Sequence, residues 1–301
     1  MPSASNPLPH SLWLALVVGN TRLHWGLFEA QKLVAVRHTH HLVTVNDVQA
    51  MVGSGFDYLD RRRPQALWMA SVVPEQTAIC LRSPITCHAV ERSHIQLANL
   101  YDTLGIDRII NLLGAKARVG WPVVVVDAGT ALTFTAGYDL EKQVGEQTDD
   151  PNQISAAVHG AAIYGGAILP GMRLQAEALK AGTAALEAAA IRSQNAIEQS
   201  ELPTRWANDT EGAIASGLIY GAIATLTDRL SDWWQRFPNG KAVLTGGDGP
   251  QLYRFLQQKT PAIAARVSLE SELMFYGMSA YRQGIAEDSM EGSIEGSTNR
   301  S

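Results

Sequence analysis

Residues 121–134 read Trp-Pro-Val-Val-Val-Val-Asp-Ala-Gly-Thr-Ala-Leu-Thr-Phe, and this stretch decides the fold. Val123 to Val126 form a β-branched run without polar alternation, which is typical of a strand buried on both faces. The run ends at Asp127, Gly129 and Thr130, where the chain turns into a second expected strand. Backbone N–H groups at such a turn can bind a phosphate, and the carboxylate can bind a cation. Taken alone, the stretch fits equally well a tight turn that Asp127 and Thr130 merely cap.

A second copy of the pattern begins at Leu12. Residues 12–28 read Leu-Trp-Leu-Ala-Leu-Val-Val-Gly-Asn-Thr-Arg-Leu-His-Trp-Gly-Leu-Phe, which is again an apolar strand, a glycine turn and a strand. Two such units about a hundred residues apart indicate an internal duplication, with one phosphate-binding hairpin in each half. This organisation is similar to that of the actin-like ATPase and sugar-kinase superfamily. We therefore expect an α/β fold of two duplicated, ribonuclease H-like lobes, each a mixed sheet flanked by helices, with a nucleotide cleft between them.

The expected boundary between the lobes lies before Gly120-Trp-Pro, where a predicted helix ends. The lobes and tails are predicted as an N-terminal lobe at 12–119, a C-terminal lobe at 120–286, and disordered tails at 1–11 and 287–301. Helical spacing predicts helices at 107–118, 211–237 and 271–283. Residues 165–173 are predicted to form a glycine-rich turn between a strand and a helix. The polar stretches 141–157 and 187–207 are predicted to be surface insertions.

Composition limits the class of function. The chain has 301 residues, 46% hydrophobic residues and a net charge of −5, which gives no electrostatic footprint for nucleic acid. Its two cysteines, Cys80 and Cys87, lack metal-site spacing and are expected to be reduced. The apolar stretch from Leu12 to Val18 is too short for export or for spanning a membrane. We expect a cytoplasmic protein without nucleic-acid or membrane partners.

Seven short motifs occur in a fixed order along the chain. They are Gly19-Asn-Thr21, Ser71-Val-Val-Pro74, Gly105-Ile-Asp-Arg108, Asp127-Ala-Gly-Thr-Ala-Leu-Thr133, Gly165-Gly-Ala-Ile-Leu-Pro-Gly171, Asn208-Asp-Thr210 and Thr245-Gly-Gly-Asp248. Each is weak alone; Gly-Ile-Asp-Arg, for example, also suits an ordinary helix start. As an ordered set from Leu12 to Gln283 they resemble the type III pantothenate kinase family.

The resemblance implies an activity and a set of ligands. It implies a homodimer with an actin-like ATPase fold that transfers the ATP γ-phosphate to the primary hydroxyl of pantothenate, the first step of coenzyme A synthesis. It also implies magnesium with the ATP and a monovalent cation, potassium or ammonium. The implied partners are therefore pantothenate, ATP and a second copy of the chain.

The resemblance also assigns roles to residues of this chain. The resemblance implies that Asp107 is the general base. The chemistry is consistent, since a carboxylate within reach of the hydroxyl can orient it and accept its proton. Asp127 corresponds to the potassium ligand. The substrate-binding residues implied for pantothenate are Gly105, Ile106, Asp107, Arg108 and Thr210. The ATP-binding residues implied are Val17, Val18, Gly19, Asn20, Thr21, Arg22, Leu23, His24, Gly129 and Thr130.

At one position the family role has an alternative, and at two positions the sequence departs from the family pattern. Thr210 corresponds to a threonine that reaches the substrate from the neighbouring subunit, but it also suits a plain helix cap. Val17 stands where the family carries an aspartate that orients hydrated magnesium. Ala98 stands where the family commonly carries a tyrosine that contacts pantothenate, and Tyr101 is nearby but off register.

Two other functions stay open from the sequence. One is a different small-molecule kinase of the same fold, with its acceptor changed through Ala98. The other is a catalytically weak or silent ATP-binding regulator, in which Val17 marks lost metal chemistry. The presence of Asp107, Arg108 and Asp127 favours an enzyme, because a silent protein has no chemical need for a base and a cation site.

Overall fold

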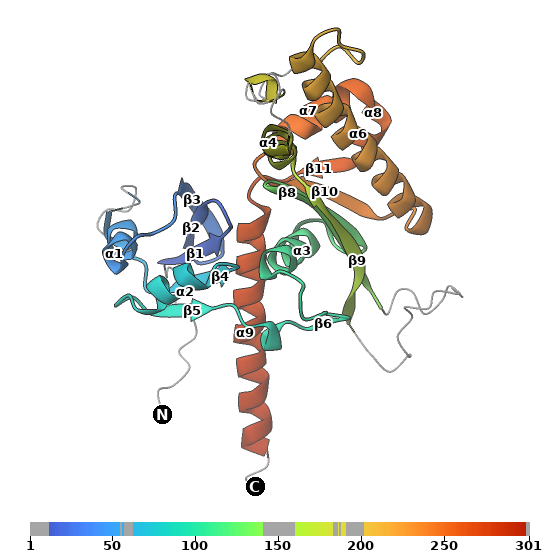
Figure 1. Cartoon of the computed structure of the whole chain (residues 1–301). Coiled ribbons are helices and arrows are strands. Elements are labelled where there is room, and N and C mark those ends of the chain that lie inside the picture. The colour runs from blue at the N-terminus through green and yellow to red at the C-terminus, as the bar shows by residue number, and fades with distance from the viewer. Residues whose placement is uncertain are drawn as a thin grey trace. The chain divides into compact units, whose positions relative to one another are not determined.

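The structure is a computed structural model that describes residues 12–54, 56, 63–140, 160–182, 186, 188–190 and 202–298 (Figure 1). Its contacts divide the chain into two compact units. Unit 1 comprises residues 1–96, 101–118 and 274–301, and unit 2 comprises residues 97–100 and 119–273. Each unit contains one mixed β-sheet with helices, so the predicted α/β class is confirmed.

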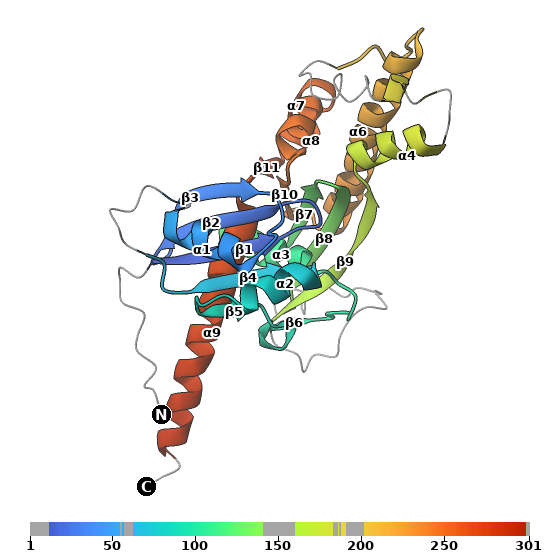
Figure 2. The same cartoon turned by 60° about the vertical axis from the view of Figure 1, so that its left-hand side comes forward.

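Unit 1 holds a five-stranded sheet in the order β3-β2-β1-β4-β5 (Figure 2). The strands are β1 (Leu12–Val18), β2 (Leu23–Glu29), β3 (Lys32–Thr39), β4 (Leu67–Ser71) and β5 (Cys87–Ala89). β4 and β5 run parallel to β1, whereas β2 and β3 form antiparallel pairs. The helices that accompany the sheet are α1 (Val45–Ser54), α2 (Pro74–Leu81), the 3-10 turn η1 (Arg92–His94), α3 (Ile106–Val119) and α9 (Leu273–Thr298).

Unit 2 holds a six-stranded sheet in the order β11-β10-β7-β8-β9-β6. The strands are β6 (Leu97–Ala98), β7 (Val123–Ala128), β8 (Ala131–Asp139), β9 (Ala161–Pro170), β10 (Lys241–Thr245) and β11 (Val267–Leu269). β10 and β11 run parallel to β7, whereas β8 and β9 form antiparallel pairs. The helices are α4 (Met172–Gly182), α6 (Thr210–Arg236), α7 (Gly249–Lys259) and α8 (Pro261–Ala264).

The two sheets share one connection pattern, which confirms the predicted duplication. In unit 1, β1, β2 and β3 form an antiparallel meander, and β4 and β5 extend the sheet in parallel on the β1 side. In unit 2, β7, β8 and β9 form the meander, and β10 and β11 extend the sheet in parallel on the β7 side. Both opening hairpins close on a glycine amide: Gly19 N donates to Arg22 O at 3.0 Å, and Gly129 N donates to Ala131 O at 2.9 Å. Apart from the edge strand β6, unit 2 therefore repeats the sheet of unit 1.

The last helix belongs to unit 1, whereas the sequence places it in a lobe at 120–286. The reason is close packing that sequence spacing does not reveal. A Cβ at Gly26 of β2 would lie 2.6 Å from the Phe275 ring of α9, and a Cβ at Gly277 would overlap the Ile110 carbonyl of α3. The two glycines therefore allow α9 to lie close against β2 and α3, which are far away from it in the sequence.

Several local predictions need correction. Gly165 and Gly166 lie inside β9, and the turn before α4 is at Gly171. α9 continues through Thr298, so residues 287–298 are helical where a disordered tail was expected. The predicted tail at 1–11 and the insertion at 141–157 lie outside the described residues, as does much of 187–207. Within the described part of the chain, no helix combines the length and apolar character needed to cross a membrane.

Candidate functional site

Polar atoms of β7, β10 and the start of α7 come together at the end of β7. Asp127 lies opposite Thr245 in the parallel pairing of β7 and β10. The Thr245 side chain is fully buried, and its Oγ1 has no hydrogen-bond partner among the described residues. The Asp248 amide donates to Ala128 O at 2.8 Å, which fixes the start of α7 to the end of β7.

Two glycines permit this close packing. Gly246 has φ +89°, and a Cβ there would overlap both Asp127 Oδ1 and Ala128 O. A Cβ at Gly171 would overlap Gly129 O and would lie 2.8 Å from Thr130 O. The Gly171 amide donates to Thr130 O at 2.9 Å, so the Gly129–Thr130 turn is held by the strand-to-helix turn at Gly171.

The oxygens around Gly246 suit a cation. A carboxylate (Asp127 Oδ1), a carbonyl (Ala128 O) and a buried hydroxyl without a partner (Thr245 Oγ1) are all oxygen ligands, which hard cations prefer. A single carboxylate with neutral oxygens balances one positive charge, as potassium or ammonium carries. The residues present therefore fit the monovalent cation that the resemblance implies.

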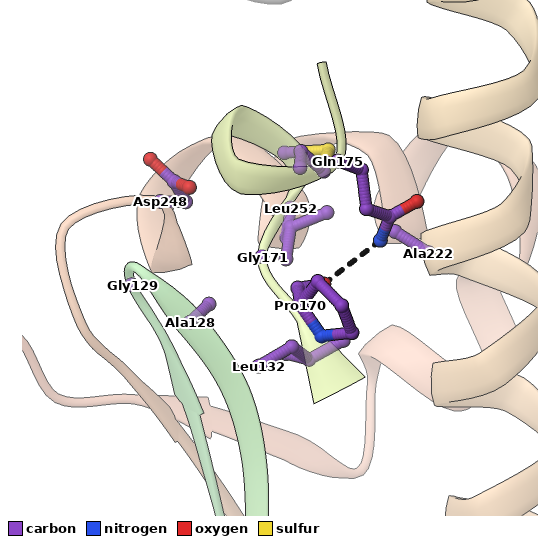
Figure 3. Close-up of a pocket in the computed structure, with 10 residues that line it drawn as sticks. Ala128, Gly129, Leu132, Pro170, Gly171, Gln175, Ala222, Asp248 and Leu252 are labelled. Atoms are coloured by element: carbon purple, nitrogen blue, oxygen red, sulfur yellow. Dashed lines mark hydrogen bonds between the residues drawn. The ribbon is translucent and has the colours of Figure 1, made fainter. Parts of the chain in front are cut away.

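A small pocket lies beside the same turn (Figure 3). Its lining residues come from β7, β8, the β9–α4 turn, α6 and α7: Ala128, Gly129, Leu132, Pro170, Gly171, Met172, Gln175, Ala222, Asp248 and Leu252. The walls are mainly apolar. Gln175 Nε2 donates to the Pro170 carbonyl at 2.8 Å, a bond drawn as the dashed line in Figure 3.

Asp248 is the ionisable residue of this pocket. Burial raises the pKa of its carboxyl, and the nearby positive charge of Arg173 opposes that rise. Asp248 occupies the N-cap position of α7 without a side-chain capping bond. The carboxylate is therefore not used to cap its own helix.

The first hairpin places Val17 through His24 at the end of β1, its turn and the start of β2. Val17 is buried and pairs with His24, which in turn pairs with His38 of β3. His24 Nδ1 and His38 Nδ1 are 2.9 Å apart, and burial, followed by the charges of His38 and Arg22, lowers the His24 pKa to about 4. His41 Nε2 lies 2.9 Å from Gly19 O, which ties the segment after β3 to the turn.

The Gly-Ile-Asp-Arg motif lies at the start of α3, as predicted. Asp107 is in the first helical turn, and the Arg108 amide donates to Asp107 Oδ1 at 2.8 Å. A Cβ at Gly105 would overlap Asp107 Oδ1, so glycine is needed for this position of the carboxylate. The Arg108 side chain is 7% exposed, and its Nη1 donates to Tyr101 Oη at 3.3 Å.

Thr210 does not cap α6, which corrects that alternative. The N-cap is Asp209, whose carboxylate accepts a hydrogen bond from the Gly212 amide at 2.8 Å. Thr210 is the first residue of the helix and is exposed. Its hydroxyl is therefore not needed to cap the helix start.

Three residues near these motifs were missed by reasoning from sequence. Asp248 and Gln175 line the pocket, and Arg92 binds the segment before α3 through the carbonyls of Tyr101 and Leu104. Asp248 ends the Thr-Gly-Gly-Asp motif, so the signal was present. No signal in the sequence indicated Arg92 or Gln175, because their partners are backbone carbonyls.

Comparisons with known proteins agree with this arrangement. A crystal structure from Campylobacter jejuni, described as a conserved Baf family transcriptional activator, has a TM-score of 0.53 at 17% identity, covering 92% of this chain and 98% of that one, and shows the shared fold. A type III pantothenate kinase of Nostoc sp. (strain PCC 7120) is 37% identical, covering 91% of this chain and 95% of its own. One of Synechocystis sp. (strain PCC 6803) is 35% identical, covering 90% and 91%. The profile of the family described as type III pantothenate kinase matches residues 13–138 and 155–231, and the chain belongs to that family.

Proposed function

We propose that this protein phosphorylates the primary hydroxyl of pantothenate with ATP, and that Asp107 is its general base. The observation that carries the proposal is the geometry at the start of α3. Gly105 leaves room for the Asp107 carboxylate, and the Arg108 amide orients it at 2.8 Å. A carboxylate held in this way can orient the acceptor hydroxyl and accept its proton as the phosphoryl group transfers.

The remaining roles divide between the two hairpins. We assign ATP binding to residues 17–24, which comprise the end of β1, its turn and the start of β2, and to Gly129 and Thr130. Asp127, Ala128 O and Thr245 Oγ1 would hold potassium or ammonium, which would supply a positive charge to offset the charge of the ATP phosphates. Magnesium accompanies the ATP. Gly105, Ile106, Arg108 and Thr210 bind pantothenate.

We also propose a homodimer in which Thr210 serves the partner's site. Support comes from a smooth stripe on α6: Ala213, Gly217 and Gly221 are exposed, and a Cβ at either glycine would meet nothing within 4 Å. Such a stripe permits close approach of another backbone. Trp206, just before this helix, is 88% exposed.

An ADP-coupled assay tests the proposal. Purified protein with Mg-ATP, potassium and pantothenate is expected to release ADP in step with pantothenate consumed. Turnover with a different acceptor only would assign another kinase activity. Nucleotide binding without turnover on any acceptor would favour the regulatory function.

A further inference from the structure

His24 and His38 form a pair of imidazoles on neighbouring strands of unit 1. They lie opposite each other in the antiparallel pairing of β2 and β3, and their Nδ1 atoms are 2.9 Å apart. Side chains at directly opposite positions share one face of a sheet, so the backbone keeps the two rings together. Neither ring has another hydrogen-bond partner among the described residues. The sheet itself therefore positions the pair.

The protonation state of His24 suits a metal ligand, because a metal binds the neutral imidazole. Burial, followed by the charges of His38 and Arg22, lowers the pKa of His24 to about 4, so this ring is neutral at neutral pH. When His38 is neutral too, one Nδ1 proton can be shared between the rings. Alternatively, each ring carries its proton on Nε2, and both Nδ1 lone pairs are then available to one metal ion.

The distance between the two nitrogens favours particular metals. Bonds from a metal to imidazole nitrogens are about 2.0–2.1 Å long, so two nitrogens 2.9 Å apart would subtend an angle of about 90° at one ion. That angle suits the tetragonal geometry of Cu2+ or Ni2+, whereas tetrahedral Zn2+ needs the nitrogens farther apart. Cu2+ is also the divalent metal of its row that nitrogen ligands bind most strongly.

The two histidines would be the protein ligands of such a site. In the described part of the chain, no group of three or more histidine, cysteine, aspartate and glutamate side chains could hold a metal, so water would complete the coordination. His38 is exposed, which gives water access. The positive charge of Arg22 opposes a cation, but this side chain is exposed and its charge is screened by solvent. We therefore expect weaker binding than at a closed site with four protein ligands.

We propose that His24 and His38 form a binding site for a divalent transition metal, Cu2+ or Ni2+, held through both Nδ1 atoms. His24 is the last residue of the segment assigned to ATP, residues 17–24, so the metal would link this segment to β3. The site differs in chemistry from the one at Asp127, whose oxygen ligands suit a harder ion. The inference does not depend on the proposed function, since it requires neither ATP nor pantothenate.

Cu2+ binding to the full chain tests the site through affinity and through electron paramagnetic resonance. Wild type is compared with His24→Gln, His38→Gln and the control His40→Gln, which removes an exposed imidazole two residues beyond the pair. With one equivalent of Cu2+, the spectra of wild type and His40→Gln should show two nitrogen ligands. His24→Gln and His38→Gln should each bind Cu2+ about tenfold or more weakly than wild type, because one of the two protein ligands is gone.

Melting temperatures with and without Ni2+ give a second measurement. A ligand that binds only the folded protein stabilises it, so Ni2+ should raise the melting temperature of wild type and of His40→Gln. The increase should be absent in His38→Gln. His38 is exposed, so this variant keeps the test decisive even where His24→Gln does not fold.

Three results would overturn the inference. The first is equal Cu2+ affinity in wild type and His38→Gln. The second is a loss of affinity in His40→Gln as large as the loss in His38→Gln, because the metal would then not depend on the pair. The third is tighter binding of Zn2+ than of Cu2+, which would contradict the angle that the nitrogen distance implies.

Discussion

Asp127 and Thr245 lie side by side in the parallel pair of β7 and β10, and the threonine hydroxyl is buried without a hydrogen-bond partner in the described part of the chain. A buried polar atom that lacks a partner costs free energy, so its presence needs a reason. A cation between the two side chains would supply one, because the hydroxyl oxygen would become a ligand. The same cation would offset repulsion between Asp127 and the ATP phosphates.

The pairing of Asp127 with Thr245 predicts that activity depends on which monovalent cation is present. Activity should rise when potassium or ammonium replaces sodium, and Asp127→Ala should lose that response. Thr245→Val, which keeps the shape and removes the buried hydroxyl, should weaken the response without unfolding the protein. Steady-state rates across a series of chloride salts at fixed ionic strength measure it. An enzyme equally active in sodium and potassium would contradict the site.

Gly246 and Gly247 form a matched pair for testing the packing around Asp127. Gly246→Ala forces a Cβ against Asp127 Oδ1 and Ala128 O at φ +89°, whereas a Cβ at Gly247 meets nothing within 4 Å. Gly246→Ala should therefore lower the free energy of unfolding by about 1–3 kcal/mol or more, and Gly247→Ala should change it little. Urea denaturation of both variants measures the difference. Equal stabilities would show that the turn at Gly246 adapts freely.

Substitutions at the neighbouring residues Asp209 and Thr210 should have different effects, one on stability and the other on activity. Asp209→Ala removes the α6 cap and should cost about 1 kcal/mol of stability. Thr210→Ala should leave stability near wild type and reduce turnover, by up to about tenfold for one neutral hydrogen bond.

Mixing variants tests whether Thr210 acts across a dimer. A mixed dimer of Asp107→Asn and Thr210→Ala chains would hold one site with both native residues, so mixing should raise activity above the sum of the separate proteins. If subunit exchange is verified and mixing gives no gain in activity, Thr210 either serves the active site of its own chain or has no role in an active site.

His24 predicts a pH dependence of stability. Its pKa of about 4 in the folded protein is below the ordinary value of 6.5, so the unfolded chain takes up the proton first. The stability that His24 contributes is fully present above pH 6.5 and is lost as the pH falls toward 4. His24→Gln should flatten the melting temperature over this window. A profile identical to wild type would show that His24 is not responsible.

The sequence predicted the duplicated fold and the hairpins because these depend on local patterns. A continuous β-branched run such as Val123 to Val126 favours a buried strand, and the glycine that follows it indicates the turn. The helix cap was misassigned because Asp209 and Thr210 are both good capping residues, and only backbone geometry distinguishes them.

Other features could not be predicted, because they arise from packing between distant segments. Gly277 looks like an ordinary helical residue until it lies against Ile110 of α3, and this contact places α9 in unit 1. The contact that Tyr101 makes could not be predicted from its position in the sequence. In the structure the Arg108 guanidinium, seven residues along the chain, donates to Tyr101 Oη.

The central claim is that Asp107 accepts the proton of the pantothenate hydroxyl, and the ADP-coupled rate of Asp107→Asn tests it most directly. With saturating pantothenate, Mg-ATP and potassium, the account predicts kcat reduced by about two to four orders of magnitude, with an unchanged melting temperature. Asparagine keeps the shape and the hydrogen-bonding oxygen but cannot take the proton. A folded Asp107→Asn enzyme that turns over pantothenate at near wild-type kcat would contradict the account.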